Sequence, residues 1–234
     1  MKVTAIVPAA GTGERMQCGV KKPYIELCCR PILSYTLQVV GKDPSIDRIV
    51  VPVYPGEEEC CRKQIVAPLD LAAEVIIIAG GRVRQESVSK ALVHVSSSCD
   101  EVLIHDGARP LVTDDLIARA ISETHTKQAT TLGVPVKDSI TRASHEHGTI
   151  IETLNRNGLF AVQTPQTFLR DIIMEAHRAA AQDGFAGTDD ASLVERIGIP
   201  VTILPGAYTN IKITTFEDLL FAEAVLAGRN AVAG

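Results

Sequence analysis

The chain has no tryptophan, and aromatic residues make up only 4% of its 234 residues. Its hydrophobic core must therefore be built mainly from valine, isoleucine, leucine and alanine. The chain also has no excess of positive charge, because its formal net charge is -5. We therefore expect no general attraction to nucleic acid or to an anionic membrane. Any bound anion must be held by locally placed cations.

The cysteines do not show the spacing of a zinc site or of a disulfide framework. No C-x-x-C pair is present, and the full set is Cys18, Cys28, Cys29, Cys60, Cys61 and Cys99. We expect reduced thiols that fill small spaces. No apolar run approaches the ~20 residues of a membrane span. The first residues lack a secretory signal pattern, because a strand-like run begins at Val3. These absences predict a cytoplasmic protein with no membrane partner.

Short runs rich in valine and isoleucine alternate with helical patterns along the first 130 residues. Strands are predicted at 3–7, 48–53, 75–78 and 101–105, and helices at 31–40, 57–65, 84–94 and 116–124. Buried parallel strands are apolar in this way because helices cover both of their faces. Thr113, followed by two aspartates, is an N-cap candidate for the last helix. The alternation predicts an α/β protein with a Rossmann-like, doubly wound and mostly parallel sheet.

The alternation stops after residue 130. A strand is predicted at 131–136, and two short β runs at 139–142 and 149–153 then flank the polar segment A-S-H-E-H-G. This pattern indicates a β-hairpin, which is too weakly apolar to cover itself and is expected to project and pack on something else, such as a second copy of the chain. His145 and His147 resemble a metal pair, but a polar hairpin tip is the favoured interpretation. From residue 168 the α/β character returns, so we expect one domain over residues 1–234 with an inserted arm at about 137–155.

A loop of small residues follows the first strand and reads P-A-A-G-T-G-E-R-M over residues 8–16. Such loops hold phosphate, because their backbone N–H groups point inward and glycine lets a ligand approach. The loop does not match the dinucleotide fingerprint, because Met16 stands where the third glycine belongs. The failed fingerprint argues against a dehydrogenase. The loop does not match the P-loop either, and an unliganded turn stays an alternative. Two cations, Arg15 and Lys22, suit the neutralisation of a polyphosphate.

A series of motifs then resembles one known family. The motifs are P-A-A-G-x-G-x-R-M, K-P-Y, G-G-R with Ser87-Val88, H-D-G-A-R-P at 105–110, R-N-G-L at 156–159, T-P-Q at 164–166, T-D-D at 188–190 and N-I-K at 210–212. In this order they resemble the methylerythritol phosphate cytidylyltransferases, and they cover nearly the whole chain. The resemblance implies a nucleotidyltransferase that joins 2-C-methyl-D-erythritol 4-phosphate to the cytidylyl group of CTP and releases pyrophosphate.

The resemblance also implies cofactors and partners. It implies Mg²⁺, a role in the bacterial or plastid isoprenoid pathway, and a homodimer in which an arm of each subunit reaches the other's active site. A plant homologue would be found in the plastid stroma. The nearest alternative is a ribitol 5-phosphate cytidylyltransferase, which would share the CTP loop and differ in the acceptor pocket. A catalytically dead nucleotide-binding protein is disfavoured because all the expected cations are present.

The resemblance implies a role for individual residues. The catalytic cations would be Arg15, Lys22, Arg156 and Lys212. CTP would be bordered by Ala9, Ala10, Gly11, Gly80, Ser87, Asp106 and Arg109. The acceptor would be bound by Ser139, Thr164, Thr188 and Asp189, with Arg156 and Ser139 supplied by the partner subunit. The metal ligands stay open: Asp106 is a candidate, and phosphate and water oxygens are the alternative.

Two positions depart from the family pattern. Ser139 stands where the family often has threonine, so that the hydroxyl is kept. Lys21 stands where many members have proline, which alters the approach of the chain to Lys22.

Structural explanations compete with several of these assignments. Asp106 and Arg109 could form a turn clamp, Arg156 could be a turn residue, and Thr188-Asp189 could be a helix N-cap. Lys212 alternates with Ile211 and Ile213, which predicts a strand lysine that points away from the core. In favour of a site, nucleotidyl transfer needs cations that bring two anions together and neutralise developing charge.

Overall fold

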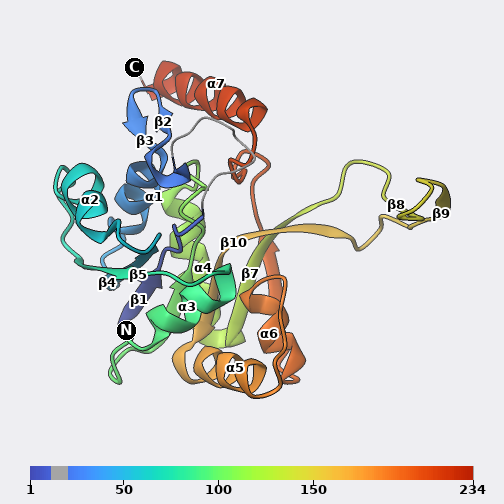
Figure 1. Ribbon diagram of the computed structural model, residues 1–234, viewed down its shortest axis with the longest axis horizontal. Coiled ribbons are helices and arrows are strands. Elements are labelled where there is room, and N and C mark those ends of the chain that lie inside the picture. Colours follow the sequence, from blue (N-terminus) through green and yellow to red (C-terminus); the bar gives the residue numbers. More distant parts are fainter. Residues whose placement is uncertain (12–20, 234) are drawn as a thin grey trace.

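The computed structural model describes residues 1–11 and 21–233. A seven-stranded sheet runs through its centre in the order β11-β7-β10-β6-β1-β4-β5 (Figure 1). Its strands are β1 (Val3–Ile6), β4 (Ile46–Val53), β5 (Glu74–Ala79), β6 (Glu101–Ile104), β7 (Ala129–Pro135), β10 (Phe160–Leu169) and β11 (Thr202–Pro205). Neighbouring strands are parallel except where β10 pairs with β6 and β7. The predicted mostly parallel α/β sheet is confirmed.

Helices cover both faces of this sheet. The core on one face contains residues of α1 (Ile32–Val40), α4 (Asp114–Lys127), α2 (Glu58–Cys61) and the π-helical turn η3 (Arg62–Val66). The core on the other face contains residues of α3 (Arg84–Leu92), α5 (Arg170–Gln182) and α6 (Asp190–Arg196). The strands supply both cores in alternation: in β4, Ile49 and Val51 belong to the first core and Val50 to the second. A strand with period-two side chains between two helical layers must be apolar throughout.

A third, smaller apolar cluster joins the two ends of the chain. It contains residues of the short hairpin β2 (Glu26–Leu27) and β3 (Arg30–Pro31), of α1, and of the last helix, α7 (Phe216–Ala233). In Figure 1, α7 lies beside this hairpin. The 3-10 turn η2 (Lys22–Tyr24) precedes the hairpin and leads into the site described below. The five described cysteines are free, and no helix within the described ranges is long and apolar enough to cross a membrane.

The strand β10 is absent from the sequence prediction. Its middle section, Gln163 to Thr167, is polar except for Pro165, yet it is buried between β6 and β7. The side chains of Gln163, Thr164 and Gln166 tolerate burial because they are hydrogen-bonded, whereas the Thr167 hydroxyl has no partner among the described residues. For example, the Nε2 of Gln166 donates to Thr131 Oγ1 at 3.1 Å and to Asp189 Oδ2 at 2.8 Å. A pattern search for apolar runs cannot find a strand of this kind.

The strand interpretation of Lys212 is wrong, because residues 210–214 have no regular secondary structure and follow β11 as an irregular segment. The predicted N-cap of α4 at Thr113 is confirmed, with an extended backbone, although the Thr113 side chain makes no capping hydrogen bond. By contrast, Asp189 caps α6 with a complete capping box, in which Ser192 N donates to the Asp189 carboxylate at 2.9 Å.

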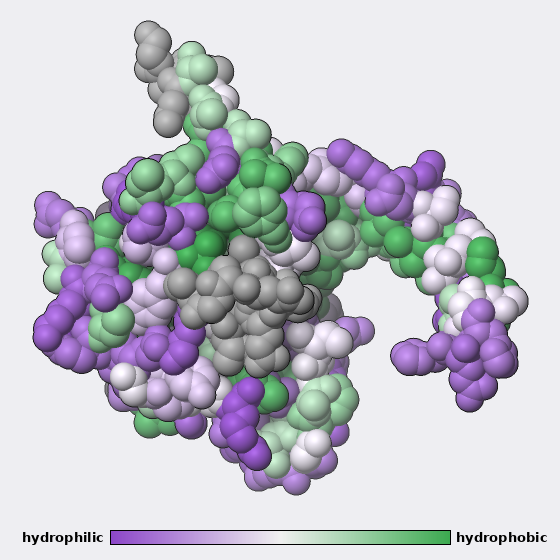
Figure 2. Space-filling view, turned by 45° about the horizontal axis from the view of Figure 1, so that its top comes forward, coloured by the Kyte–Doolittle hydropathy of each residue, from purple (hydrophilic) through white to green (hydrophobic). Residues whose placement is uncertain are grey.

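The predicted hairpin segment, called here the arm (residues 137–155), forms the antiparallel strands β8 (Thr141–Ala143) and β9 (Ile150–Thr153). In Figures 1 and 2 it stands away from the sheet, with a hydrophilic tip. Its apolar side chains are uncovered: Ile150 and Ile151 are 62% and 63% exposed. Because successive strand residues point to opposite faces, apolar side chains of β9 are exposed on both sides of the arm.

Glu101, the first residue of β6, carries a buried carboxyl group. It is 0% exposed, and neither carboxylate oxygen has a hydrogen-bond partner among the described residues. Burial, followed by the charge of Asp100, raises the pKa of this carboxyl from 4.5 to about 7. The folded chain therefore keeps a proton that the unfolded chain loses, so folding stability should fall as the pH rises from about 4.5 to 7.

Replacement Glu101→Gln removes this titration while keeping the shape of the side chain. The gain in the free energy of unfolding should be small at pH 5 and should approach about 3 kcal/mol at pH 8. Urea unfolding at the two pH values measures it. The half-exposed Glu123→Gln is the matched control and should show no such difference. An equal effect of Glu101→Gln at both pH values would contradict a buried, protonated carboxyl.

Candidate active site

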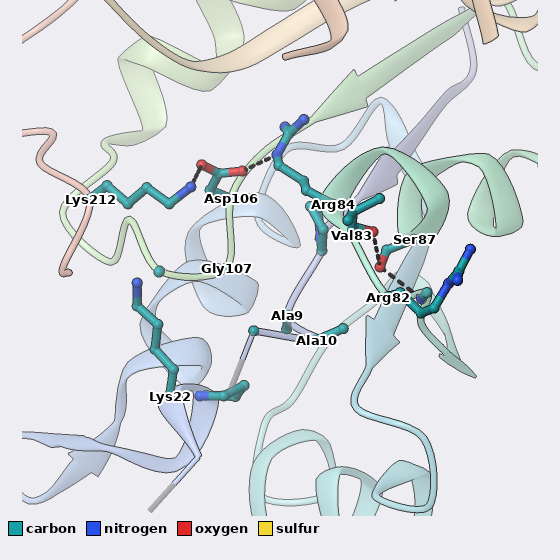
Figure 3. A pocket seen from close by; sticks show the side chains of 15 residues that line it. Ala9, Ala10, Lys22, Arg82, Val83, Arg84, Ser87, Asp106, Gly107 and Lys212 are labelled. Atoms are coloured by element: carbon teal, nitrogen blue, oxygen red, sulfur yellow. Dashed lines mark hydrogen bonds and ion pairs between the residues drawn. The ribbon is translucent and has the colours of Figure 1, made fainter. Parts of the chain in front are cut away.

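A pocket opens where three parallel strands end. It is lined by the segment after β1 (Pro8 to Gly11), the segment after β5 (Gly81 to Ser87) and the segment after β6 (Asp106 to Ala108). The carboxyl edge of an open α/β sheet is where such folds bind ligands. Seven of the predicted site residues line this pocket: Ala9, Ala10, Gly11, Lys22, Ser87, Asp106 and Lys212. In Figure 3, Lys22 and Lys212 lie on one side of it, and Arg82 and Ser87 on the other.

The floor of the pocket is formed by closely packed backbone. Ala9 N donates to Pro52 O at 2.8 Å, and Gly80 N donates to Val53 O at 2.7 Å. A β-carbon on Gly80 would lie 2.5 Å from the β-carbon of Ala10, so only glycine fits there. Gly80 therefore supports the loop from behind, whereas Ala9 and Ala10 face the pocket. Small side chains at these positions allow a ligand to approach the backbone.

Ser87 fixes the second wall. Its hydroxyl accepts a hydrogen bond from Gly81 N at 2.9 Å and donates to Val83 O at 3.1 Å (Figure 3). Lys90 Nζ donates to Gly80 O at 2.8 Å. These contacts hold the turn from Gly80 to Val83 in one shape at the start of α3, and this turn contributes Arg82, whose side chain is 94% exposed.

The charge at the centre of the site is the Asp106 carboxylate. Lys212 Nζ and Arg84 Nε each lie 2.8 Å from one of its oxygens, and Arg109 Nε lies at 4.0 Å (Figure 3). Burial alone would raise the pKa of Asp106, but the charges of Arg84 and Lys212 outweigh it and hold the pKa well below its ordinary value. Asp106 is therefore ionised and orients two cations at the pocket wall.

Arg84, from α3, connects this site to α5 and α6 of the same helical layer. Its Nη1 lies 2.6 Å from Oδ2 of Asp190, which is 1% exposed, and Asp190 Oδ1 lies 3.0 Å from His177 Nε2. Burial lowers the pKa of Arg84, but Asp190 and Asp106 together raise it above its ordinary value. Asp190 has a lowered pKa because Arg84 overcomes the effect of burial.

Arg84 was not among the predicted site residues, although the sequence carried a signal. It is the first residue of α3, where the partial positive charge of the helix N-terminus disfavours a cation. A cation placed against this rule, directly after the G-G-R motif, indicates a nearby anion. The anions are Asp106 and Asp190, which lie 22 and 106 positions further along the chain.

A second network fixes the backbone of Asp106. Asp106 N donates to Thr164 Oγ1 at 3.0 Å, and this hydroxyl lies 3.0 Å from His105 Nδ1. His105 Nε2 lies 3.2 Å from Arg109 O, and because a carbonyl only accepts, Nε2 carries the proton and Nδ1 accepts from Thr164. Burial lowers the pKa of His105 to about 4, so the imidazole is neutral. Thr164 is 4% exposed and positions Asp106 rather than lining the pocket.

Arg109 holds the neighbouring segment, residues 210–213, in place. Its Nη1 donates to Asn210 O at 2.7 Å, and Ile213 N donates to Ala108 O at 2.9 Å. The segment that contains Lys212 is thereby attached to the H-D-G-A-R-P turn on both sides of the lysine. Lys212 reaches the pocket from this irregular segment and not from a strand.

The remaining predicted residues lie elsewhere. Arg15 lies outside the described residues. Ser139 is exposed on the arm, and Arg156, just after it, is exposed and donates to Lys137 O at 2.6 Å. Thr188 is exposed in the loop before α6, where Asp189 is the helix cap. None of these four described residues lines the pocket of its own chain.

The donor set for a metal ion is small. Asp106 is the only carboxylate that lines the pocket in the described part of the chain, and the described residues contain no group of three or more His, Cys, Asp or Glu side chains able to hold a metal. Mg²⁺ is characteristically bound by one or two carboxylates together with substrate phosphates and water. Asp106 is the candidate protein ligand for that mode, although its Oδ1 pairs with Arg84 and its Oδ2 with Lys212 in this structure.

Small backbone loops and four lysine and arginine side chains line the carboxyl edge of a mostly parallel sheet, an arrangement typical of proteins that bind phosphate groups. The sequence matches the family described as 2-C-methyl-D-erythritol 4-phosphate cytidylyltransferase over residues 3–228. It is 45% identical to the enzyme of that name from Syntrophus aciditrophicus, with 96% of each chain covered. The chain belongs to this family, whose members are nucleotidyltransferases of the cytidylyltransferase type.

Two further similarities extend this result. The chain is 45% identical to the bifunctional enzyme IspD/IspF from Desulforudis audaxviator, over 98% of its own length and 58% of that longer protein. The crystal structure of 4-diphosphocytidyl-2C-methyl-D-erythritol synthase from Anaerococcus prevotii is similar to this fold with a TM-score of 0.85. The two are 30% identical, with 97% of this chain and 96% of that chain covered.

The second prediction concerns Arg84, which neutralises two buried carboxylates. Replacement Arg84→Met leaves Asp106 and Asp190 with less positive charge, so the free energy of unfolding at pH 7 should fall by about 3 kcal/mol. The loss should shrink towards pH 3, because carboxylates with lowered pKa values stabilise the fold only where they are ionised. Urea unfolding at both pH values checks this. The neighbouring, exposed Arg82→Met is the control, and an equally small effect of the two variants would refute the assignment.

Proposed function

We propose that the pocket holds CTP and that the chain transfers its cytidylyl group to 2-C-methyl-D-erythritol 4-phosphate, giving 4-diphosphocytidyl-2-C-methyl-D-erythritol and pyrophosphate. The observation that supports this most is the arrangement around Asp106, which directs Lys212 and Arg84 to the wall that also contains Lys22. Family membership indicates the same reaction. The position of this chain in the isoprenoid pathway follows from that product.

The chemistry assigned to the protein is mainly electrostatic. The acceptor phosphate is already ionised, so its oxygen attacks the α-phosphorus of CTP without a strong general base, and the bond to the pyrophosphate oxygen breaks. The protein must hold two anions together and stabilise the charge that develops on the transferred group. Lys22 and Lys212 are assigned to that task, together with Arg15 from the loop.

We assign each pocket residue a role from its position in the pocket. Ala9, Ala10 and Gly11 present backbone to the nucleotide, and Ser87 holds the turn that faces it. Lys212 is oriented by Asp106, and we assign it to the α-phosphate. Asp106 would be the protein's ligand for Mg²⁺, which supplies neutralisation of phosphate charge when bound.

The acceptor side is proposed to require a second subunit. Ser139 and Arg156 belong to the arm and its base, and neither lines the pocket of its own chain. The arm exposes Ile140, Ile150 and Ile151 beside its polar residues, as expected of a segment that packs on a partner. We therefore propose a homodimer in which the arm of one subunit completes the acceptor site of the other. The cytoplasmic location stays a prediction.

Incubation of the purified protein with CTP, Mg²⁺ and methylerythritol phosphate tests the function. Pyrophosphate should be released, and ribitol 5-phosphate should react at least ~100-fold more slowly. The variant Lys212→Ala should lower turnover by about 100-fold or more while the chain stays folded. Faster pyrophosphate release with ribitol 5-phosphate would show that the alternative function is the correct one. Pyrophosphate release with neither acceptor would refute both functions.

Mixing two inactive variants tests the shared site. Chains with Lys212→Ala have an intact arm, and chains with Arg156→Ala have an intact pocket. A mixed dimer then contains one complete site, so that a statistical mixture should recover about a quarter of the wild-type activity. Subunit exchange is verified beforehand by mass labelling. No recovery after proven exchange would place Arg156 in the site of its own chain.

A further inference from the structure

A lysine beside the pocket makes contacts that the proposed reaction does not explain. Lys21 directly precedes Lys22, but it does not line the pocket. Its ammonium lies 2.5 Å from Glu57 Oε1 and 3.8 Å from the centre of the Tyr54 ring. The side chain of Lys21 is 35% exposed and that of Glu57 is 22% exposed, so the pair is partly shielded from water.

The partners of Lys21 are brought together by a tight turn. The sequence Tyr54-Pro55-Gly56-Glu57 follows β4, and Glu57 N donates to Tyr54 O at 3.0 Å. Gly56 has a φ of +89°, as the third position of a type II turn requires, with proline before it. The turn places the first and fourth side chains next to each other, so that an aromatic face and a carboxylate contact the same ammonium.

The backbone of Lys21 is the starting point for Lys22. Lys21 has φ -67° and ψ 140°, and it is the N-cap of η2, where Tyr24 N donates to Lys21 O at 3.0 Å. Lys22 is the first residue of η2 and lines the pocket. The contacts of Lys21 with the 54–57 turn therefore fix the point from which the turn that carries Lys22 starts. Tyr24 adds a contact to the 54–57 turn, since its hydroxyl donates to Glu57 O at 3.4 Å.

The φ of Lys21 is also the value that a proline ring imposes. Among the described residues, the Lys21 amide has no backbone hydrogen-bond acceptor. A proline at this position would therefore lose no backbone bond to a described residue and would fix the same φ. The lysine reaches that conformation by contacts of its side chain instead.

We propose that Lys21 is a positioning residue: its clamp on Tyr54 and Glu57 holds the 21–24 turn so that Lys22 reaches the nucleotide phosphates. The inference rests on the proposed binding of CTP. Loss of the clamp lowers the fraction of chains with the turn in the binding-competent conformation, and the apparent affinity falls by that fraction. Lys21 itself does not contact the nucleotide.

The test compares CTP binding, measured by calorimetry with Mg²⁺, among variants of the full chain. For Lys21→Ala we expect the Kd for CTP to rise about tenfold, as the loss of one ion pair and one cation–π contact suggests. Lys21→Pro should restore a Kd within about twofold of the wild type, because it imposes the same φ. Glu57→Gln should weaken binding as well, and the double variant Lys21→Ala/Glu57→Gln should be no weaker than Lys21→Ala.

Two controls separate positioning from charge and from general stability. Lys63→Ala breaks the exposed Lys63–Glu59 pair on the following helical segment and should leave the Kd unchanged. The melting temperatures of Lys21→Ala and Lys63→Ala should be equally close to that of the wild type. The KM for the acceptor should not change in Lys21→Ala, since Lys21 acts only on the nucleotide side.

The outcomes distinguish this proposal from the proposed function. The proposal is overturned if Lys21→Ala binds CTP as the wild type does, or if Lys21→Pro stays as weak as Lys21→Ala. Tighter binding by Glu57→Gln would also overturn it, because Lys21 would then act through its own charge. If the wild type binds CTP but releases no pyrophosphate, the proposed reaction is refuted. The positioning role of Lys21 is then still tested by the Kd values of the variants. A wild type that does not bind CTP overturns both.

Discussion

The ion pairs of one carboxylate hold the site together. Asp106 follows β6 and binds Arg84 from α3 and Lys212 from the segment after β11, so that three distant parts of the chain meet at one group. Arg84 extends the link to Asp190 of α6 and His177 of α5, which lie in the same helical layer as α3. Breaking a buried pair leaves an uncompensated charge, which costs far more than the pair contributes. The pocket is therefore built on contacts that also hold α3, α5 and α6 together.

The sequence predicted the parts of this structure that depend on local pattern. Apolar runs identified β1, β4, β5 and β6, because these strands are buried on both faces. The pocket residues Lys22, Asp106 and Lys212 were identified from their motifs. What the sequence could not supply were pairings between distant polar residues. The strand β10 was missed because Gln163 and Gln166 are buried through hydrogen bonds to residues far away in the chain, and Arg84 because its two partners are known only after folding.

The sequence also does not show which predicted residues contact the ligand and which support the residues that do. Motifs indicate that a residue matters without saying whether it contacts the ligand or supports one that does. Thr164 and Arg109 belong to such motifs, yet the first positions the Asp106 amide and the second holds the backbone at Asn210. Gly80 likewise supports Ala10 from behind. Burial decides between the two roles, and burial depends on the assembled sheet.

The turn at Lys21 shows two physical routes to one backbone conformation. A proline would fix φ by its covalent ring and would act chiefly by restricting the unfolded chain. The lysine reaches φ -67° through an ion pair and an aromatic contact that exist only in the folded chain. These contacts are electrostatic and partly exposed, so salt weakens them. A chain with lysine here should therefore bind its nucleotide with a steeper salt dependence than the same chain with proline, even though both present Lys22 from the same turn.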